Sequence, residues 1–230
     1  MDPDRAALSA DFQRLSATLP AAVGVALART DRVYAVGQWS SGAAWSTIKV
    51  PLAVAALHED HVGAYELVVK AITESDNAAS EQLWSLLGAA PDAARKVRAV
   101  VAQCGDTETV VESQRLRAGF TPFGQTQWSV QRQARFAEGL AGFPAAAAVV
   151  DLMRQLTAGQ RWGLARKGLA AKGGWGPGAD GGYLVRQFGI APTRTGQWGV
   201  AMAADSDTFD AGVEAIDALT DWLLGRLTDY

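Results

Sequence analysis

Apolar residues recur at different periods along the chain, and each change of period marks a new part of it. Residues 2–19 follow helical spacing, which predicts an N-terminal helix with apolar positions Leu8, Phe12, Leu15 and Leu19. The runs AAVGVALAR (21–29) and RVYAVGQW (32–39) are short and strand-like, and they predict a hairpin. From Ser46 to about Leu156 the helical spacing returns, in segments broken by glycine, proline and acidic turns.

The last part of the chain returns to strand-like spacing. The runs LAAKGGW, YLVRQFGI and WGVAMAA follow Gly168, and helical spacing then covers Phe209 to Leu227. Because strands are expected only near the two ends, one sheet must be assembled from both termini, with a helical subdomain inserted between them. We expect one compact domain over 1–230, with a sheet part (1–45 plus 160–230), a helical part (46–159) and a cleft where they meet.

Residues 107–127 lack a clear period and predict a long loop, of a length that is more often functional than idle.

Hydrophobic residues make up 49% of the chain and charged residues 20%, which excludes a largely disordered or fibrous protein. The net charge of −3 gives no electrostatic reason to expect nucleic acid as a partner. No apolar run is long enough to predict a membrane span. The single cysteine, Cys104, excludes an internal disulfide and a cysteine-based metal cluster.

Ser46 and Lys49 lie in the stretch WSTIK, at the start of the helical part. Residues three positions apart on a helix share a face. A serine hydroxyl is a weak nucleophile until a base takes its proton, and a partly buried lysine with a lowered pKa can act as that base. The same spacing also fits a capping serine beside a surface lysine, so other residues must decide between the two interpretations.

Two further segments favour a reactive site. ESDNAAS contains Ser75 and Asn77, the only asparagine of the chain, between two helical runs. AKGGWG places Lys172, one of five lysines, on a predicted strand before two glycines. The absence of side chains there lets a substrate backbone lie close along the strand edge.

In this order, STIK, SDN and KGG resemble the S-x-x-K, S-D-N and K-T-G elements of class A β-lactamases and penicillin-binding proteins. ELVVKAITESDNAASEQLWSLLG resembles the family's helix before and after S-D-N, and the resemblance extends over nearly the whole chain. It implies an α+β fold of the β-lactamase/transpeptidase type. In that fold an antiparallel sheet built from both termini is flanked by helices, with an inserted all-helical subdomain.

The resemblance also implies roles for individual residues. Ser46 would be the acylated nucleophile, Lys49 its activating partner, and Ser75 a proton relay toward the leaving group. The implied substrate-binding residues are Asn77, Lys172, Gly174 and Trp175. The backbone N–H groups of Ser46 and Trp175 would form the oxyanion hole. No metal site and no cofactor is implied.

The sequence departs from the family pattern in three places. Gly173 stands where the family has a hydroxyl residue that helps to hold a substrate carboxylate. No asparagine follows Asn77, so the deacylating E-x-x-x-N motif is absent. Glu108 and Glu112 are then either solvated loop carboxylates or a substitute base with a different geometry. The third departure is the short connection of 29 positions from the motif serine at 46 to that at 75, which predicts a more open site.

Other features of the sequence have more than one interpretation or indicate no functional site. Arg186 and Arg194 either anchor a substrate carboxylate or are exposed arginines of the sheet. Trp45 and Trp175 adjoin motifs and are candidates for lining the cleft. LHEDH lacks the H-E-x-x-H zinc spacing, and GPGADG leads to a strand rather than a helix, so we interpret them as a helix end and a hairpin loop.

These observations predict a serine hydrolase that forms an acyl-enzyme at Ser46 on an amide, peptide or ester, with weak β-lactam turnover. Two alternatives are a catalytically weak or inactive relative that binds peptidoglycan fragments or a protein, and a genuine class A-type β-lactamase. The expected partner is a small-molecule or peptide substrate, β-lactam-like or peptidoglycan-like. The resemblance implies an extracytoplasmic or secreted location, although the N-terminal residues show no signal-peptide pattern.

Overall fold

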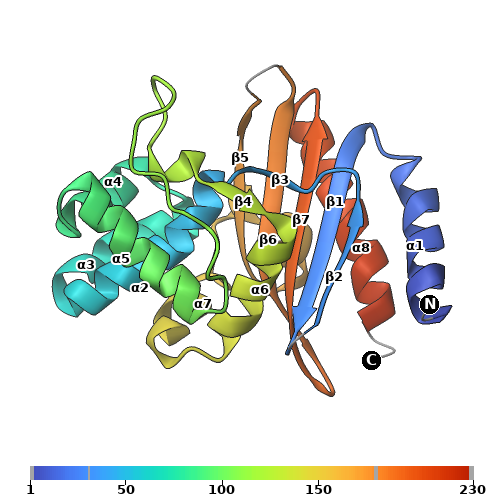
Figure 1. The fold of residues 1–230 in the computed structure, drawn as a ribbon, viewed down its shortest axis with the longest axis horizontal. Helices are drawn as coiled ribbons and strands as arrows, with labels where there is room; N and C mark the ends of the chain where they lie inside the picture. Colours follow the sequence, from blue (N-terminus) through green and yellow to red (C-terminus); the bar gives the residue numbers. More distant parts are fainter. Residues whose placement is uncertain (1–2, 31, 179–180, 228–230) are drawn as a thin grey trace.

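A five-stranded antiparallel sheet forms one side of the molecule, and a group of helices forms the other (Figure 1). The computed structural model describes residues 3–30, 32–178 and 181–227. Its α-helices are α1 (Pro3–Ser16), α2 (Lys49–Glu59), α3 (His61–Val69), α4 (Asn77–Leu86), α5 (Ala90–Gln103), α6 (Val130–Ala141), α7 (Ala147–Leu152) and α8 (Phe209–Leu227). Its strands are β1 (Ala21–Arg29), β2 (Arg32–Gly37), β3 (Ser41–Ala43), β4 (Gln127–Ser129), β5 (Ala170–Pro177), β6 (Tyr183–Thr193) and β7 (Gly196–Ser206).

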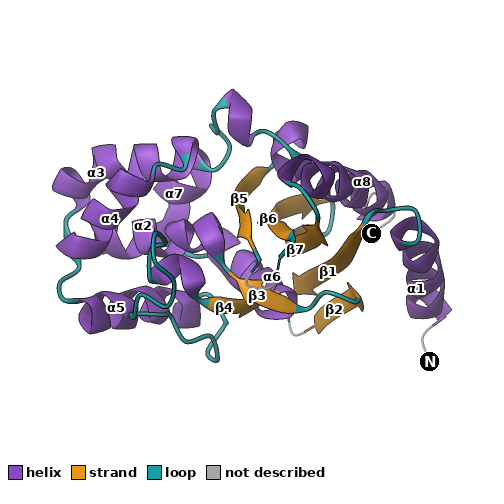
Figure 2. Ribbon diagram, turned by 90° about the horizontal axis from the view of Figure 1, so that it is seen from above, coloured by secondary structure: helices purple, strands orange, loops and turns teal. Residues whose placement is uncertain are grey.

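The large sheet has the strand order β2-β1-β7-β6-β5. The N-terminal hairpin joins the three C-terminal strands through β1 and β7, which pair antiparallel with Ala21 opposite Ser206. The prediction of an α+β fold with an antiparallel sheet assembled from both termini is therefore confirmed. β5 is an edge strand, and it lies on the side of the sheet nearest the helical group (Figure 2).

Helices cover both faces of this sheet. Successive residues of each strand point to opposite faces, so each strand contributes side chains to two hydrophobic cores. Val25 and Leu27 of β1 belong to the core under α8, whereas Ala26 and Ala28 belong to the core under α6. α6 lies within the predicted helical part (46–159), yet it packs against β1 and β7. The sheet is thus the middle layer between α8 and α6.

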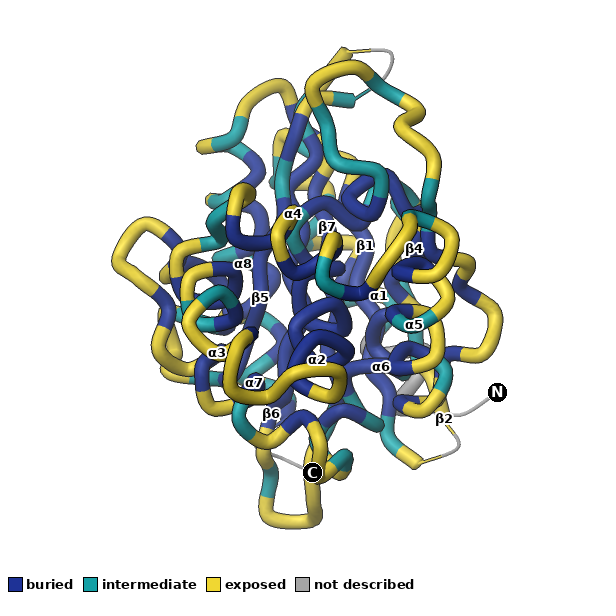
Figure 3. Tube along the Cα trace, turned by 90° about the vertical axis from the view of Figure 1, so that its left-hand side faces the viewer, coloured by how far each residue is buried: buried dark blue, intermediate teal, exposed yellow. Residues whose placement is uncertain are grey.

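α2 is the central helix of the helical group. Its residues from Lys49 to Leu57 are all buried, because α3, α4 and α5 pack around it (Figure 3). This environment explains the nearly unbroken apolar run VPLAVAAL, since a helix that is covered on all sides needs no polar face. Lys49 at its first position is the exception and needs a separate explanation.

A second, two-stranded sheet of β3 and β4 escaped the sequence analysis. Each strand has three residues, which is too short for an alternating pattern to show. β4 follows a short 3₁₀ turn, η3 (Phe123–Gln125), so the end of the predicted loop 107–127 is ordered by pairing and turns. Within the described ranges, no helix combines the length and the apolar character needed to cross a membrane.

Candidate active site

A 3₁₀ turn, η1 (Trp45–Ile48), places Ser46 directly before α2. The backbone N–H of Lys49 donates to the carbonyl oxygen of Ser46, so the two residues are one turn apart. Trp45 has a φ of +50°, in the left-handed region that non-glycine residues adopt only when the surrounding structure imposes it. Ser46 is half-buried, and its hydroxyl makes no hydrogen bond to another residue of the described ranges.

Gly174 of β5 lies against the backbone of this turn. An ideal Cβ at Gly174 would be 2.8 Å from the nitrogen of Ser46, 2.9 Å from the oxygen of Ala44 and 2.9 Å from the nitrogen of Thr47. Backbone atoms cannot move aside as a flexible side chain can. The lack of a side chain at position 174 therefore allows the edge of β5 to lie beside Ser46.

Gly174→Ala is expected to lower the free energy of unfolding by about 2–3 kcal/mol, because the new methyl group overpacks three backbone atoms. Gly159→Ala is the matched control, since a Cβ there meets nothing within 4 Å and should change stability by less than about 0.5 kcal/mol. Urea unfolding of both variants checks this. Equal stability of the two would contradict the close approach of β5 to η1.

Two buried lysines converge on Ser75. Lys49, only 2% exposed, donates from Nζ to the carbonyl oxygen of Ser75 at 2.5 Å and to Oδ1 of Asn77 at 2.7 Å. The same Nζ lies 3.4 Å from the Ser75 hydroxyl. Lys172 of β5 is fully buried, and its Nζ lies 2.8 Å from the Ser75 hydroxyl. The Ser75 hydroxyl is thus within hydrogen-bond distance of two amines from opposite sides of the site.

The buried position of these amines changes their protonation. Burial lowers the pKa of Lys49 to about 8, although the negative charge of Asp76 opposes the change. Burial also lowers the pKa of Lys172 well below its ordinary value, and the positive charge of Lys49 adds to the effect. A neutral amine that can accept a proton is therefore accessible close to neutral pH.

Local backbone geometry holds Ser75 in place. A π-helical turn, η2 (Lys70–Glu74), ends at Ser75, which has a φ of +61°. The next residue, Asp76, caps α4 by accepting a hydrogen bond from the backbone N–H of Ala79 at 2.6 Å. Single π-helical turns and left-handed residues of this kind are frequent at functional sites.

Six of the seven predicted site residues therefore meet where η1, the start of α4 and the edge of β5 come together. These are Ser46, Lys49, Ser75, Asn77, Lys172 and Gly174. Trp175 is also on β5, but its side chain packs on the other face of the sheet, against Phe209 and Trp162. The interpretation of Trp175 as a side chain lining the cleft is wrong, and only its backbone remains a candidate.

Trp45 is buried, with 8% of the residue exposed, and its ring lies edge-on to that of Phe120, with centroids 5.2 Å apart.

Both interpretations of Arg186 are wrong. Arg186 is fully buried because β6 is an inner strand whose face is covered by β3, β4 and α6. Its guanidinium donates to the carbonyl oxygens of Gly42, Ala43 and Trp128 and to Oε1 of Gln133. It joins the two sheets and cannot reach a substrate. Arg194 is exposed in the turn between β6 and β7, eight residues along the chain from Arg186.

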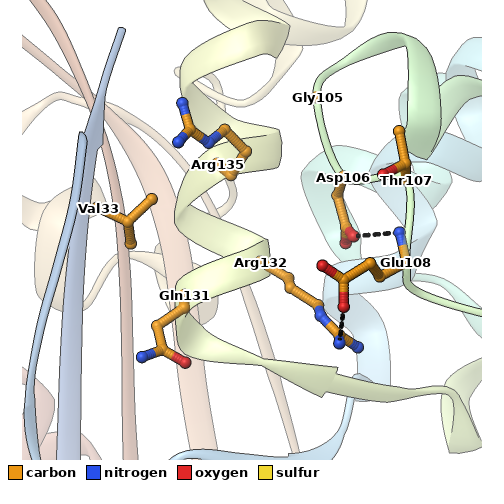
Figure 4. Close-up of a pocket in the computed structure, with 8 residues that line it drawn as sticks. All are labelled: Val33, Gly105, Asp106, Thr107, Glu108, Gln131, Arg132 and Arg135. Carbon is orange, nitrogen blue, oxygen red and sulfur yellow. Dashed lines mark hydrogen bonds and ion pairs between the residues drawn. The ribbon is translucent and has the colours of Figure 1, made fainter. Parts of the chain in front are cut away.

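Neither candidate carboxylate of the loop contacts the two lysines. Glu108 forms an ion pair with Arg132 in a pocket between α6 and the segment after α5 (Figure 4). Oε1 of Glu112 accepts hydrogen bonds from the backbone N–H groups of Ser113 and Gln114, at 2.8 and 2.7 Å. Both carboxylates therefore have local structural partners.

Trp162 occupies the space beside the unusual Gly173. An ideal Cβ at Gly173 would lie 2.4 Å from Cζ2 of the Trp162 ring, which is 6% exposed. The position where the resemblance leads one to expect a hydroxyl side chain is therefore filled by an indole from the segment before β5. Sequence reasoning missed Trp162, because it lies 11 positions from Gly173 and belongs to no motif.

The fold is that of the class A β-lactamases and related penicillin-binding structures. The TLA-3 extended-spectrum β-lactamase matches with a TM-score of 0.72 at 15% identity, over 96% of this chain and 99% of that one. A class A β-lactamase from Bacteroides cellulosilyticus DSM 14838 matches with a TM-score of 0.73 at 15% identity, over 96% and 98%. PBP-A matches with a TM-score of 0.69 at 20% identity, over 96% and 95%.

At the level of sequence alone, no protein-family model and no curated protein matches the chain. The likeness therefore establishes the fold, and the chemistry must be argued from the residues of this chain.

Proposed function

We propose that this chain is a serine hydrolase of the β-lactamase type that forms an acyl-enzyme at Ser46 and releases it slowly. The observation that carries this proposal is the convergence of two buried lysine amines on the Ser75 hydroxyl, beside the half-buried Ser46. Burying an amine costs free energy. The start of a helix needs no buried amine for its structure, whereas proton transfer to and from a nucleophile needs groups that can accept and donate a proton.

Acylation would begin with the neutral amine of Lys49. It takes the proton of Ser46 as Oγ of Ser46 bonds to the substrate carbonyl carbon. The Ser75 hydroxyl then gives its proton to the leaving nitrogen, oxygen or sulfur as the carbonyl bond to that atom breaks. Lys49, which has gained the proton of Ser46, passes it to Ser75, whose hydroxyl lies 3.4 Å from the Lys49 amine. The products are an ester at Ser46 and a free amine, alcohol or thiol.

Substrate would lie along the open edge of β5. The backbone N–H groups of Ser46 and Trp175 would hold the developing oxyanion, an interaction that commonly contributes about 3 kcal/mol to transition-state stabilisation. Asn77 would hydrogen-bond the acyl part of the substrate while it accepts from Lys49. Lys172 and Gly174 would bound the site on the strand side.

The indole at Gly173 bears on the substrate class. Because residue 173 is glycine, with Trp162 packed beside it, no hydroxyl from this position assists in holding a carboxylate beside Lys172. We therefore propose that neutral esters, thioesters and amides react better than β-lactams, whose recognition commonly relies on such a group. The family likeness also supports an extracytoplasmic setting for this activity.

Burst kinetics test this proposal. Mixing the protein with a neutral aryl thioester should release about one leaving group per chain, followed by steady release that is about 100-fold slower. Glu108 and Glu112, the two carboxylates considered as a substitute base, are held by local partners instead of being placed to activate water. Steady turnover without a burst would show that deacylation is not slow.

A second function deserves a test because Gly173 and Trp162 alter the third motif. The chain would then be an inactive relative that binds peptidoglycan fragments or another protein. Noncovalent binding of a peptidoglycan fragment, together with no burst from thioesters, amides or penicillins, would favour it.

A further inference from the structure

The residues of β5 that face the helical part lie in a fixed order along the site. Alternation along the strand brings Lys172, Gly174 and Gly176 to one face. Lys172 meets the Ser75 hydroxyl, and Gly174 lies against the backbone of Ser46. The indole of Trp45 fills the space beside Gly176. A ligand that lies along this edge would therefore pass the reactive serine near its middle.

A guanidinium stands at the end of this edge opposite to Lys172. Arg117, from the loop before β4, donates from Nη1 to the carbonyl oxygen of Pro177 at 2.9 Å. Its guanidinium lies 4.6 Å from the centroid of the Phe120 ring and 5.8 Å from that of Trp45. Stacking on two rings holds the cation in one orientation. Arg117 is half-buried, and among the described residues its guanidinium makes only this one hydrogen bond, so donors remain for a ligand.

The loop that carries Arg117 is attached to both sides of the site. Nη2 of Arg115 lies 3.9 Å from Oε1 of Glu81 in α4, and Nη1 of Arg115 donates to the carbonyl oxygen of Phe120 at 2.7 Å. Arg117 reaches β5 at Pro177. The loop therefore lies between α4 and β5, at the far end of the substrate edge, as its course in Figure 1 shows.

The proposed mechanism gives this edge a direction, and the inference rests on it. Ser75 and Lys172 serve the leaving group, so the acyl group must extend the other way, toward Pro177 and Arg117. A strand rises about 3.3 Å per residue, so Pro177 lies about 10 Å from Gly174. This separation corresponds to about three residues of an extended acyl chain.

We propose that Arg117 is a specificity-determining residue that binds a carboxylate in the acyl part of the substrate, about three residues from the reacting carbonyl. The preferred substrate is then an acidic peptide, or a similar extended acyl chain, whose charge is remote from the bond that breaks. A guanidinium presents a planar set of donors that suits a carboxylate.

An isosteric pair of substrates tests this. Aryl thioesters of acetyl-glutamyl-glycyl-glycine and acetyl-glutaminyl-glycyl-glycine differ only in the remote charge. Wild type should acylate faster with the acidic ester, by about fivefold in kcat/KM at low salt, and the preference should shrink in high salt. Arg117→Gln should slow only the acidic ester and so remove the preference. Arg115→Gln, which loses the same charge from the same loop, should retain it.

Binding to an unreactive chain separates this inference from the proposed function. Calorimetry measures the dissociation constants of the two corresponding peptide amides for Ser46→Ala, with and without Arg117→Gln. Tighter binding of the acidic amide that Arg117→Gln abolishes supports the inference, even if neither thioester acylates wild type and the proposed function fails. Three results overturn the inference. They are the absence of an acidic preference in both assays, a preference that survives Arg117→Gln, and an equal loss of affinity or rate for the acidic and the neutral ligand on Arg117→Gln. The last result would indicate that Arg117 only holds the loop against Pro177.

Discussion

Ser46→Ala is expected to lower the rate of acylation by roughly 10⁴-fold or more and to leave the fold intact. The backbone of Ser46 lies beside the edge of β5, one turn before Lys49, whose side chain is buried. It is half-buried and bonded to no other described residue, so its loss leaves no unsatisfied partner. Release of the leaving group from a neutral aryl thioester, followed by stopped flow, measures the effect.

Ser41→Ala is the matched control for this variant. Ser41 is an exposed serine of β3, with no hydrogen bond to either lysine. It should acylate at the wild-type rate, and both variants should unfold at the wild-type temperature. Acylation of Ser46→Ala at the rate of the control would place the nucleophile elsewhere and refute the proposed chemistry.

Lys49→Met is expected to lower the acylation rate by about 10³-fold, because it removes the amine that takes the proton of Ser46. In wild type the amine must be neutral to act, and its pKa is about 8. The rate should therefore rise about tenfold per pH unit below this value and level off above it. Lys70→Met, which removes an exposed lysine of η2, should leave both the rate and its pH profile unchanged. A profile that is flat through this range would exclude Lys49 as the base.

The same pKa gives a prediction for stability, and its sign follows from proton counting. The pKa of Lys49 is about 8 in the folded chain and 10.5 when exposed, so between these values the unfolded chain binds more protons. Stability should therefore rise with pH across this window, by about 3 kcal/mol for this group. Below about pH 8 the cost of the buried charge is present in full. Lys49→Met should reduce this rise in urea-unfolding measurements, and the part contributed by Lys172 should remain.

Elements with long periodic signals could be predicted from the sequence. The apolar spacing of 209–227 marks α8 from its first residue to its last, and the two strand-like runs at 21–29 and 32–39 form the β1–β2 hairpin. The motif residues could be found as well, because chemistry restricts which residue types occur at a reactive site. The structure adds that the side chains of Lys49 and Asn77 meet, and that the Lys172 amine reaches the Ser75 hydroxyl.

The features that could not be predicted depend on which side chain covers which strand. Alternation shows that Arg186 and Phe188 share a face of β6, but it does not show that β3, β4 and α6 bury that face. The contact of Trp162 with Gly173 and that of Arg117 with Pro177 join distant segments with no motif of their own. These contacts determine substrate choice in our account, so the sequence predicts the reaction class better than the substrate.

Intact-mass spectrometry of wild type during reaction with a neutral aryl thioester, and in parallel with benzylpenicillin, tests the proposal that Ser46 forms an acyl-enzyme. Our account predicts a mass increase of one acyl group per chain that persists after excess reagent is removed, located by proteolysis in the peptide that contains Ser46. The thioester should form this adduct faster than the penicillin. A folded wild-type chain that acquires no adduct from either reagent, or acquires one at another residue, would contradict it.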